Sequence, residues 1–257
     1  MKKYYIHILF LSAVLSSCSR YYYVAETQNI PLFKEKNEYR LSGAFGFGDE
    51  SKAVEVHSAY SISNNIGVLA NFMHAWGGDI SDNDYGRGTC LDAGIGYFKP
   101  IRDQSVFEIY GGLGGCVQNH EYTGLHYNSS SGAIYSEYDG NSRLAFFKLF
   151  LQPSFGVTYR MLDFIASARI LSITFMDIDN NIFGNSYDYD NLNSISENGQ
   201  FFVEPAATLR GGWKNVKVQV QASYVWHVNE IETVIGEEYH FSAGLLFIFP
   251  KKAQSIE

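Results

Sequence analysis

Apolar and polar residues alternate along ten segments of this chain. The apolar side of the first segment reads Tyr39, Leu41, Gly43, Phe45 and Phe47. Successive side chains of a β-strand point to opposite faces, so the alternation predicts strands with one apolar face and one polar face. We expect these strands at roughly 39–48, 53–60, 66–76, 89–98, 106–117, 144–159, 164–173, 201–211, 216–226 and 239–249.

The charged residues of these strands all fall on the polar side. They are Arg40, Glu55, Asp92, Glu108, Lys148, Arg169, Glu204, Arg210 and Lys217. An apolar outer face and a charged interior suit a barrel embedded in lipid. The opposite arrangement stays open, because a soluble barrel that holds an apolar ligand would show the same alternation with every strand inverted.

The connections between the strands alternate in length. Short ones fall at 61–65, 99–105, 160–163 and 212–215, and long polar ones at 77–88, 118–142, 174–200 and 227–238, with only 49–52 out of order. Outward aromatic residues lie at the short-turn ends (Tyr39, Tyr60, Tyr97, Phe107, Tyr159, Phe164, Phe249) and at the opposite ends (Phe47, Trp76, Phe201, Trp226, Tyr239). Two aromatic belts and short periplasmic turns are typical of membrane barrels.

With these features, residues 39–249 resemble the outer-membrane β-barrel family, the small OmpA-like barrels in the broad sense. The resemblance implies an all-β, closed, antiparallel up-and-down transmembrane barrel, and we expect about ten strands, with eight as the alternative. Pro153 and Pro205 fall inside predicted strands, where each removes a ladder hydrogen bond. We therefore expect bulges or earlier strand ends at these two positions.

The N-terminus reads as a targeting segment. Lys2 and Lys3 precede an apolar run, and the following Leu-Ser-Ser-Cys resembles the bacterial lipobox. This resemblance implies that residues 1–17 are cleaved and that Cys18 is diacylated; an ordinary secretory signal with a chance cysteine is the alternative. We expect 18–38 to be a lipid-anchored periplasmic linker and 250–257 a periplasmic tail, with the anchor on the periplasmic side of a Gram-negative outer membrane.

Charge and composition limit the partners. The net charge of −8 becomes −10 without Lys2 and Lys3, which argues against nucleic acid. Outer-membrane lipids are the expected surroundings, and we expect a monomer. The loops at 118–142 and 174–200 combine Tyr with Ser, Gly and Asn, a composition that suits recognition of an external ligand or protein, although they could equally fold over the barrel mouth.

Inside the barrel, the charges of the nine residues nearly cancel. Buried charges persist when they are paired, so we expect an interior salt-bridge network that fills the lumen, with a narrow polar pore as the alternative. Cys90 and Cys116 face inward almost opposite each other on neighbouring strands. Outside the reducing cytosol such a pair can form a disulfide, and two buried thiols are the alternative.

Support for catalytic or metal chemistry is weak. His57 and His240 face inward near the outer rim, with Glu55 and Ser242 close by, so a hydrolase site can be drawn, but lumen packing is the commoner role of such residues. Residues 177–181 begin like a calcium loop, yet Ile182 stands where glycine is needed. We expect no catalytic site, no cofactor and no metal.

The functional expectation is a non-enzymatic outer-membrane lipoprotein with a structural or surface-interaction role through its external loops. A narrow small-solute channel is the second hypothesis. A hydrolase or lipid-modifying enzyme with its site at the rim is the third.

Overall fold

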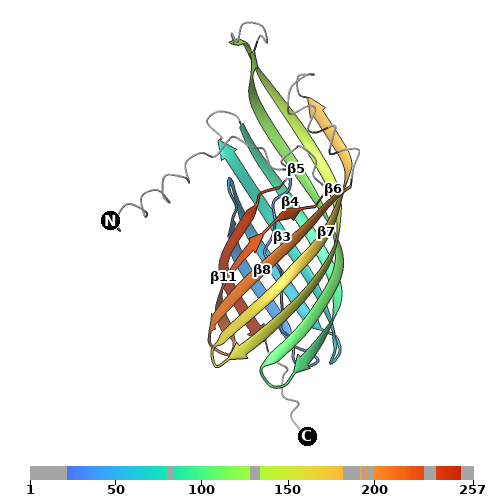
Figure 1. Cartoon of the computed structure of the whole chain (residues 1–257), viewed down its shortest axis with the longest axis vertical. Helices are drawn as coiled ribbons and strands as arrows, with labels where there is room; N and C mark the ends of the chain where they lie inside the picture. The colour runs from blue at the N-terminus through green and yellow to red at the C-terminus, as the bar shows by residue number, and fades with distance from the viewer. Residues whose placement is uncertain are drawn as a thin grey trace, which may run out of the picture.

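The chain forms a closed antiparallel β-barrel of ten strands, with a two-residue strand added at one edge (Figure 1). The structure, a computed structural model, describes residues 22–79, 84–127, 134–181, 192, 195, 199–228 and 236–249. The barrel strands are β1 (Tyr39–Phe47), β2 (Ser51–Ser61), β3 (Ile66–Asp79), β4 (Asp84–Ile101), β5 (Ser105–Tyr127), β6 (Ile134–Tyr159), β7 (Leu162–Asn181), β8 (Gln200–Gly212), β9 (Val216–Tyr224) and β11 (Tyr239–Phe249), and the added strand is β10 (Trp226–His227).

Each barrel strand pairs with its neighbours in chain order, which is the up-and-down topology. Closure comes from β1, which pairs with β2 on one side and with β11 on the other. Strand β8 pairs with β9 from Ala206 to Gly212, and nearer its start it pairs with β10 at Phe202 and Val203. The prediction of a closed ten-stranded barrel is confirmed, and the eight-stranded alternative is wrong.

The two faces of the wall differ as the alternation predicts. Along β2, buried and exposed residues alternate almost without interruption. Large apolar side chains lie on the outer surface, among them Leu91 at 63% and Ile95 at 58% exposure. All nine charged residues lie buried inside: Arg40, Glu55, Asp92, Glu108, Lys148, Arg169, Glu204, Arg210 and Lys217. The outer surface therefore has the apolar character that lipid requires.

Three strands extend much further than their sequence suggests. Strands β5, β6 and β7 rise beyond the rest of the barrel at the end opposite the short turns (Figure 1). The prediction of loops at 118–142 and 174–200 is wrong for 118–127, 134–142, 174–181 and 200, which belong to these strands and to β8. Their polar composition resembles that of a loop, but pairing with the neighbouring strand satisfies their backbone groups.

The same extension removes the calcium-loop hypothesis. Residues 177–181 form the end of β7, where Asp177 pairs with Ala145 and Asp179 pairs with Arg143 of β6. Asp177 and Asp179 lie two positions apart on an extended strand, without the tight turn by which a calcium loop brings its ligands around one ion.

The two prolines interrupt the hydrogen-bond ladders without a bulge. Pro205 faces Ala168 of β7, and on its other side it falls in the gap between the β9 and β10 pairings, where no donor is required. The β6–β7 ladder omits Pro153 and resumes in the same register. The shift of register in this ladder lies between Ala145 and Phe146 instead, so the expectation of bulges at the prolines is wrong.

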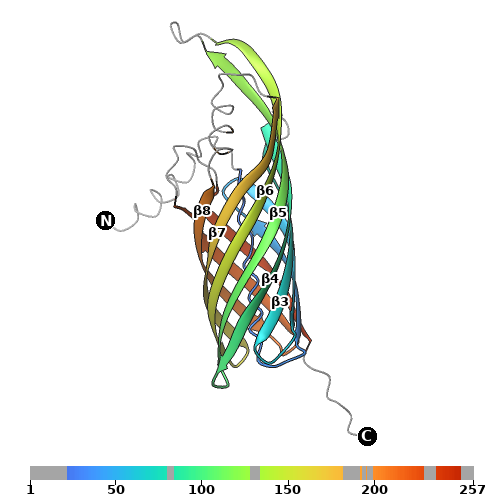
Figure 2. The ribbon, with the colours of Figure 1, turned by 90° about the vertical axis from the view of Figure 1, so that its right-hand side faces the viewer.

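The largest departure from expectation concerns the residues before β1. The chain from Tyr22 to Phe33 lies inside the barrel and runs along its length (Figure 2). Tyr22, Tyr23, Ile30 and Phe33 are each at most 1% exposed and belong to the interior apolar cluster. The prediction of a periplasmic linker outside the barrel is therefore wrong for 22–33, because the polar lumen wall supplies hydrogen-bond partners for this segment. We call residues 22–33 the lumen segment.

The remaining predictions for the two termini concern residues outside the described part of the chain. The cleaved segment 1–17, the lipidation site Cys18 and the tail 250–257 lie outside the described residues. Among the residues that the structure describes, no helix is long and apolar enough to cross a membrane.

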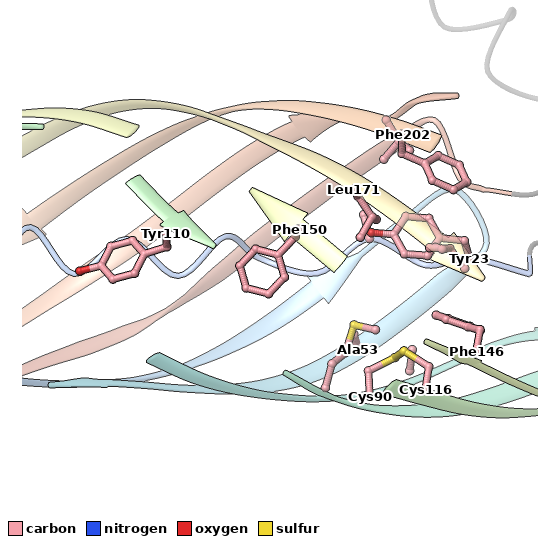
Figure 3. Packing of buried hydrophobic residues seen from close by; sticks show 14 of the residues in the cluster. Tyr23, Ala53, Cys90, Tyr110, Cys116, Phe146, Phe150, Leu171 and Phe202 are labelled. Atoms are coloured by element: carbon pink, nitrogen blue, oxygen red, sulfur yellow. A yellow bond between two sulfur atoms is a disulfide. The ribbon is translucent and has the colours of Figure 1, made fainter. Parts of the chain in front are cut away.

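Cys90 and Cys116 face each other on β4 and β5 and are joined by a disulfide, seen in Figure 3. The bridge closes a separation of 26 residues, for which the chain-entropy treatment gives about 3.5 kcal/mol of stabilisation. We expect the Cys90→Ala/Cys116→Ala variant to lower the free energy of unfolding by about that amount, as measured by urea titration in lipid vesicles. Reduced wild-type protein should match the variant, and an unchanged urea midpoint in both samples would contradict the prediction.

Candidate functional site

The barrel interior is the candidate site, because the lumen segment contacts the wall there along its whole length. An extended segment outside a sheet has backbone N–H groups without ladder partners, and each needs an acceptor when it is buried. Wall side chains provide these acceptors. The N–H of Thr27 donates to Glu55 Oε2 at 2.9 Å, and the N–H of Gln28 donates to Gln221 Oε1 at 2.7 Å.

Glu108 performs the same role for two consecutive residues. The N–H of Leu32 donates to Glu108 Oε2 at 3.1 Å, and that of Phe33 donates to Glu108 Oε1 at 3.0 Å. Both carboxylate oxygens of this fully buried side chain therefore hold the lumen segment.

The amide side chains of the segment bind the wall as well. Gln28 Nε2 donates to the carbonyl oxygen of Glu204 at 2.7 Å. Asn29 Nδ2 donates to Asn71 Oδ1 at 2.9 Å, while the carbonyl of Asn29 accepts from Gln152 Nε2 at 2.9 Å. Contacts to β3, β6 and β8 surround the segment, so it is held from several sides of the barrel.

A cluster of charges centres on Glu26 of the segment. Glu26 Oε1 lies 2.8 Å from Arg169 Nη1 and 3.1 Å from Lys148 Nζ. Lys148 also pairs with Asp92 Oδ2 at 2.8 Å. All four side chains are at most 5% exposed. The wall therefore places two buried cations where the segment brings a carboxylate.

Aromatic contacts fix the end of the segment nearest the long connections. The hydroxyl of Tyr23 donates to Glu204 Oε1. The ring of Tyr23, labelled with Phe202 in Figure 3, has its centroid 4.8 Å from that of the Phe202 ring. Phe202 stacks in turn on His227, with 4.7 Å between the ring centroids. The ring of Tyr22 meets His120 edge-on at 5.5 Å.

The other end of the segment is closed by apolar and ionic contacts beside the short turns. The centroids of the Phe33 and Phe98 rings are 5.4 Å apart, and the guanidinium carbon of Arg40 lies 5.5 Å from the centroid of the Phe33 ring. Arg40 pairs with Glu38, and Lys34 Nζ donates to the carbonyl of Asp103 at 2.7 Å.

The remaining predicted charges bind partners outside the predicted set. Lys217 Nζ lies 2.7 Å from both carboxylate oxygens of Asp163, and Arg210 Nε donates to Gln219 Oε1 at 2.7 Å. Among the nine predicted charges, Lys148 and Asp92 form an ion pair with each other. The interior network is thus built largely with residues that the alternation did not identify, chiefly Glu26, Glu38 and Asp163.

The two histidines meet on one carboxylate. His57 Nε2 and His240 Nε2 each lie 3.2 Å from an oxygen of Glu55, and Ser42 Oγ lies 3.4 Å from His57 Nδ1. All three of His57, His240 and Glu55 are at most 1% exposed, and Ser242 is buried near them. The group contacts the lumen segment through Thr27 rather than an open cleft.

Gly46 leaves the space that this histidine group occupies. A Cβ atom at Gly46 would lie 2.6 Å from His240 Cε1 and 2.8 Å from Glu55 Oε1. We expect Gly46→Ala to lower the free energy of unfolding by about 1–3 kcal/mol through overpacking. The matched control is Gly43→Ala on the same strand, whose Cβ would meet nothing closer than 3.8 Å. Equal urea midpoints for the two variants would show that the histidine group is not packed in this way.

Comparison with known proteins shows the fold. No protein-family model and no curated protein matches the chain. Among solved structures, the outer membrane protease OmpT from Escherichia coli matches with a TM-score of 0.54 at 10% identity, covering 87% of this chain and 99% of that one. The N-terminal β-barrel domain of Pseudomonas aeruginosa OprF (TM-score 0.34, 10% identity, 84% and 99% covered) and the KdgM porin (0.36, 10%, 82% and 99%) also match. The match to OmpT shows that the chain has the fold of outer-membrane β-barrels.

Proposed function

We propose that this chain, which has the fold of an outer-membrane β-barrel, is a non-enzymatic outer-membrane protein whose lumen is closed by its own N-terminal segment. Its role is structural or one of surface interaction, exerted through the strands that project from one end. The observation that carries this proposal is the lumen segment, which lies inside the barrel and binds its wall from Tyr22 to Phe33.

The filled lumen is the main argument against the channel hypothesis. A ten-stranded barrel has a narrow interior that side chains can largely occupy. Here a whole chain segment lies within it as well, together with large wall side chains such as Tyr110, Arg169 and Lys148. Solutes would have to displace both hydrogen bonds and ion pairs to pass.

The buried histidine group gives little support to a hydrolase. A catalytic nucleophile and base must reach the reacting bond of a substrate. His57 and His240 are both 1% exposed, and Thr27 covers the carboxylate that lies between them. A substrate could reach these residues only after the lumen segment had left the barrel.

The projecting strands support the surface-interaction role. Strands β5, β6 and β7 stand above the rim on the side of the long connections (Figures 1 and 2). Near the rim, β5 and β6 are joined by a 2.6 Å hydrogen bond between Tyr122 and Ser142 hydroxyls. In an outer membrane this end faces outside, since long connections are external, and an external ligand or protein would meet these strands.

Planar-bilayer conductance tests the proposal. Wild-type protein should give no discrete current steps, whereas a variant that lacks residues 22–33 should give steps of uniform size. A heat-dependent gel shift of both unboiled samples serves as the control for folding. The proposal fails if wild-type protein conducts as readily as the deletion variant.

A further inference from the structure

The lumen segment has a direction, and this direction places the chain that precedes it. Its beginning lies at the end of the barrel with the long connections. The backbone of Tyr23 forms a parallel bridge with Gly236, which precedes β11 at that end. Tyr22 contacts His120, which lies in the part of β5 beyond the disulfide.

The end of the segment lies at the opposite mouth. Phe33 packs on Phe98 near the short connection after β4, and Lys34 binds the carbonyl of Asp103 within that connection. Phe33 follows Tyr22 by eleven positions in the sequence. At roughly 3.3–3.6 Å per residue they can span up to ~36–40 Å, more than the ~25 Å apolar band of such barrels.

The length of chain before the lumen segment limits how far Cys18 can reach. Cys18 precedes Tyr22 by four positions in the sequence, and four residues span at most about 14 Å at full extension. That reach is shorter than the ~25 Å apolar band, so the chain cannot return from Tyr22 to the membrane surface at the short-turn end.

We propose that the N-terminal residues leave the barrel at the long-connection end, and that the lipid predicted on Cys18 is therefore carried on the external face of the membrane. The proposal rests on the outer-membrane location given above and on the lipobox resemblance. It reverses the expectation of an anchor at the periplasmic side, which assumed that residues 18–38 stay outside the barrel.

The exposed aromatic residues at that end offer a suitable interface. Phe47, Trp226 and Tyr239 lie on the outer surface there, each at least 46% exposed. Aromatic belts mark the depth at which acyl chains meet the head groups. A diacylated Cys18 could insert its chains into the external leaflet, while the lumen segment connects that anchor to β1 at the other mouth.

Two epitope tags in the full chain, expressed in cells, test the topology. One tag is inserted between Ser19 and Arg20 and the other between Arg102 and Asp103, in the short connection after β4. The proposal expects antibody to bind the first tag on intact cells and the second only after the outer membrane is permeabilised. A linker outside the barrel would instead place both tags on the same side, and that result would overturn the proposal.

Mass spectrometry of the purified protein tests the lipid. The N-terminal peptide should begin at Cys18 and carry acyl chains, and Cys18→Ser should abolish both features. An exposed first tag with an unmodified Cys18 would overturn the external anchor while leaving the threaded chain in place. Neither experiment depends on whether the lumen conducts, so failure here and failure of the proposed function remain distinguishable.

Discussion

Replacing Glu26 with alanine is expected to destabilise the barrel by about 3–5 kcal/mol and to loosen the lumen segment. Glu26 Oε1 is shared by Arg169 and Lys148, and all three side chains are at most 2% exposed. Without Glu26, Arg169 loses the carboxylate it pairs with and Lys148 keeps Asp92, and the loss of a partner by a buried charge costs far more than the loss of a surface pair. The measurement is urea unfolding in lipid vesicles.

The controls for this prediction lie in the same stretch of chain. Glu35→Ala removes an exposed carboxylate only nine residues away and should change stability by less than about 0.5 kcal/mol. Glu26→Gln keeps a hydrogen-bond acceptor, so its free energy of unfolding should lie between those of Glu26→Ala and the wild type. If Glu26→Ala and Glu35→Ala unfold at the same urea concentration, Glu26 does not lie between the two cations.

Replacing Glu108 with alanine is expected to cost about 2–4 kcal/mol, because two buried donors lose their acceptor at once. The backbone N–H groups of Leu32 and Phe33 both donate to Glu108. An orphaned buried donor costs about 1–3 kcal/mol, and part of the sum is offset because the desolvated carboxylate is also removed.

The matched control for Glu108 is on the same strand. Glu121→Ala removes an exposed glutamate of β5 and should leave the urea midpoint almost unchanged. The second readout is local: amide exchange at Leu32 and Phe33 should become faster in Glu108→Ala and stay slow in Glu121→Ala. A large loss of stability with unchanged exchange at these two amides would mean that Glu108 stabilises the wall alone.

The barrel wall could be predicted from the sequence because strand alternation is a local signal. Residues 216–224 alternate strictly, and the structure forms β9 over the same residues with alternating burial. The aromatic residues at the strand ends and the order of short and long connections indicated which end of the barrel faces which side of the membrane. These signals do not depend on which distant residues meet, so one sequence suffices to detect them.

The content of the lumen could not be predicted in the same way. Residues 22–33 show no alternation, and they lie within a stretch, 19–38, whose polar, tyrosine-rich composition is equally typical of a linker. Their partners are distant along the chain: Gln28 binds Gln221 across 193 residues. Glu26 appears in the sequence as an isolated acidic residue, and only the position of Lys148 and Arg169 in space gives it a role.

The extended strands were missed for a related reason. The ends of β5, β6 and β7 carry polar residues on both faces, as strands do when they leave the membrane. Without an apolar face the period of two is lost, although the backbone pairing continues. Composition alone therefore suggested loops there.

Hydrogen exchange of the unmodified protein in lipid tests the lumen segment most directly. The amides of Thr27, Gln28, Leu32 and Phe33 should exchange as slowly as those of the barrel strands, because each donates to a buried wall side chain. The amide of Glu35, on the exposed stretch before β1, should exchange within seconds. Exchange of the first four amides at the rate of an unstructured peptide would show that residues 22–33 lie outside the barrel.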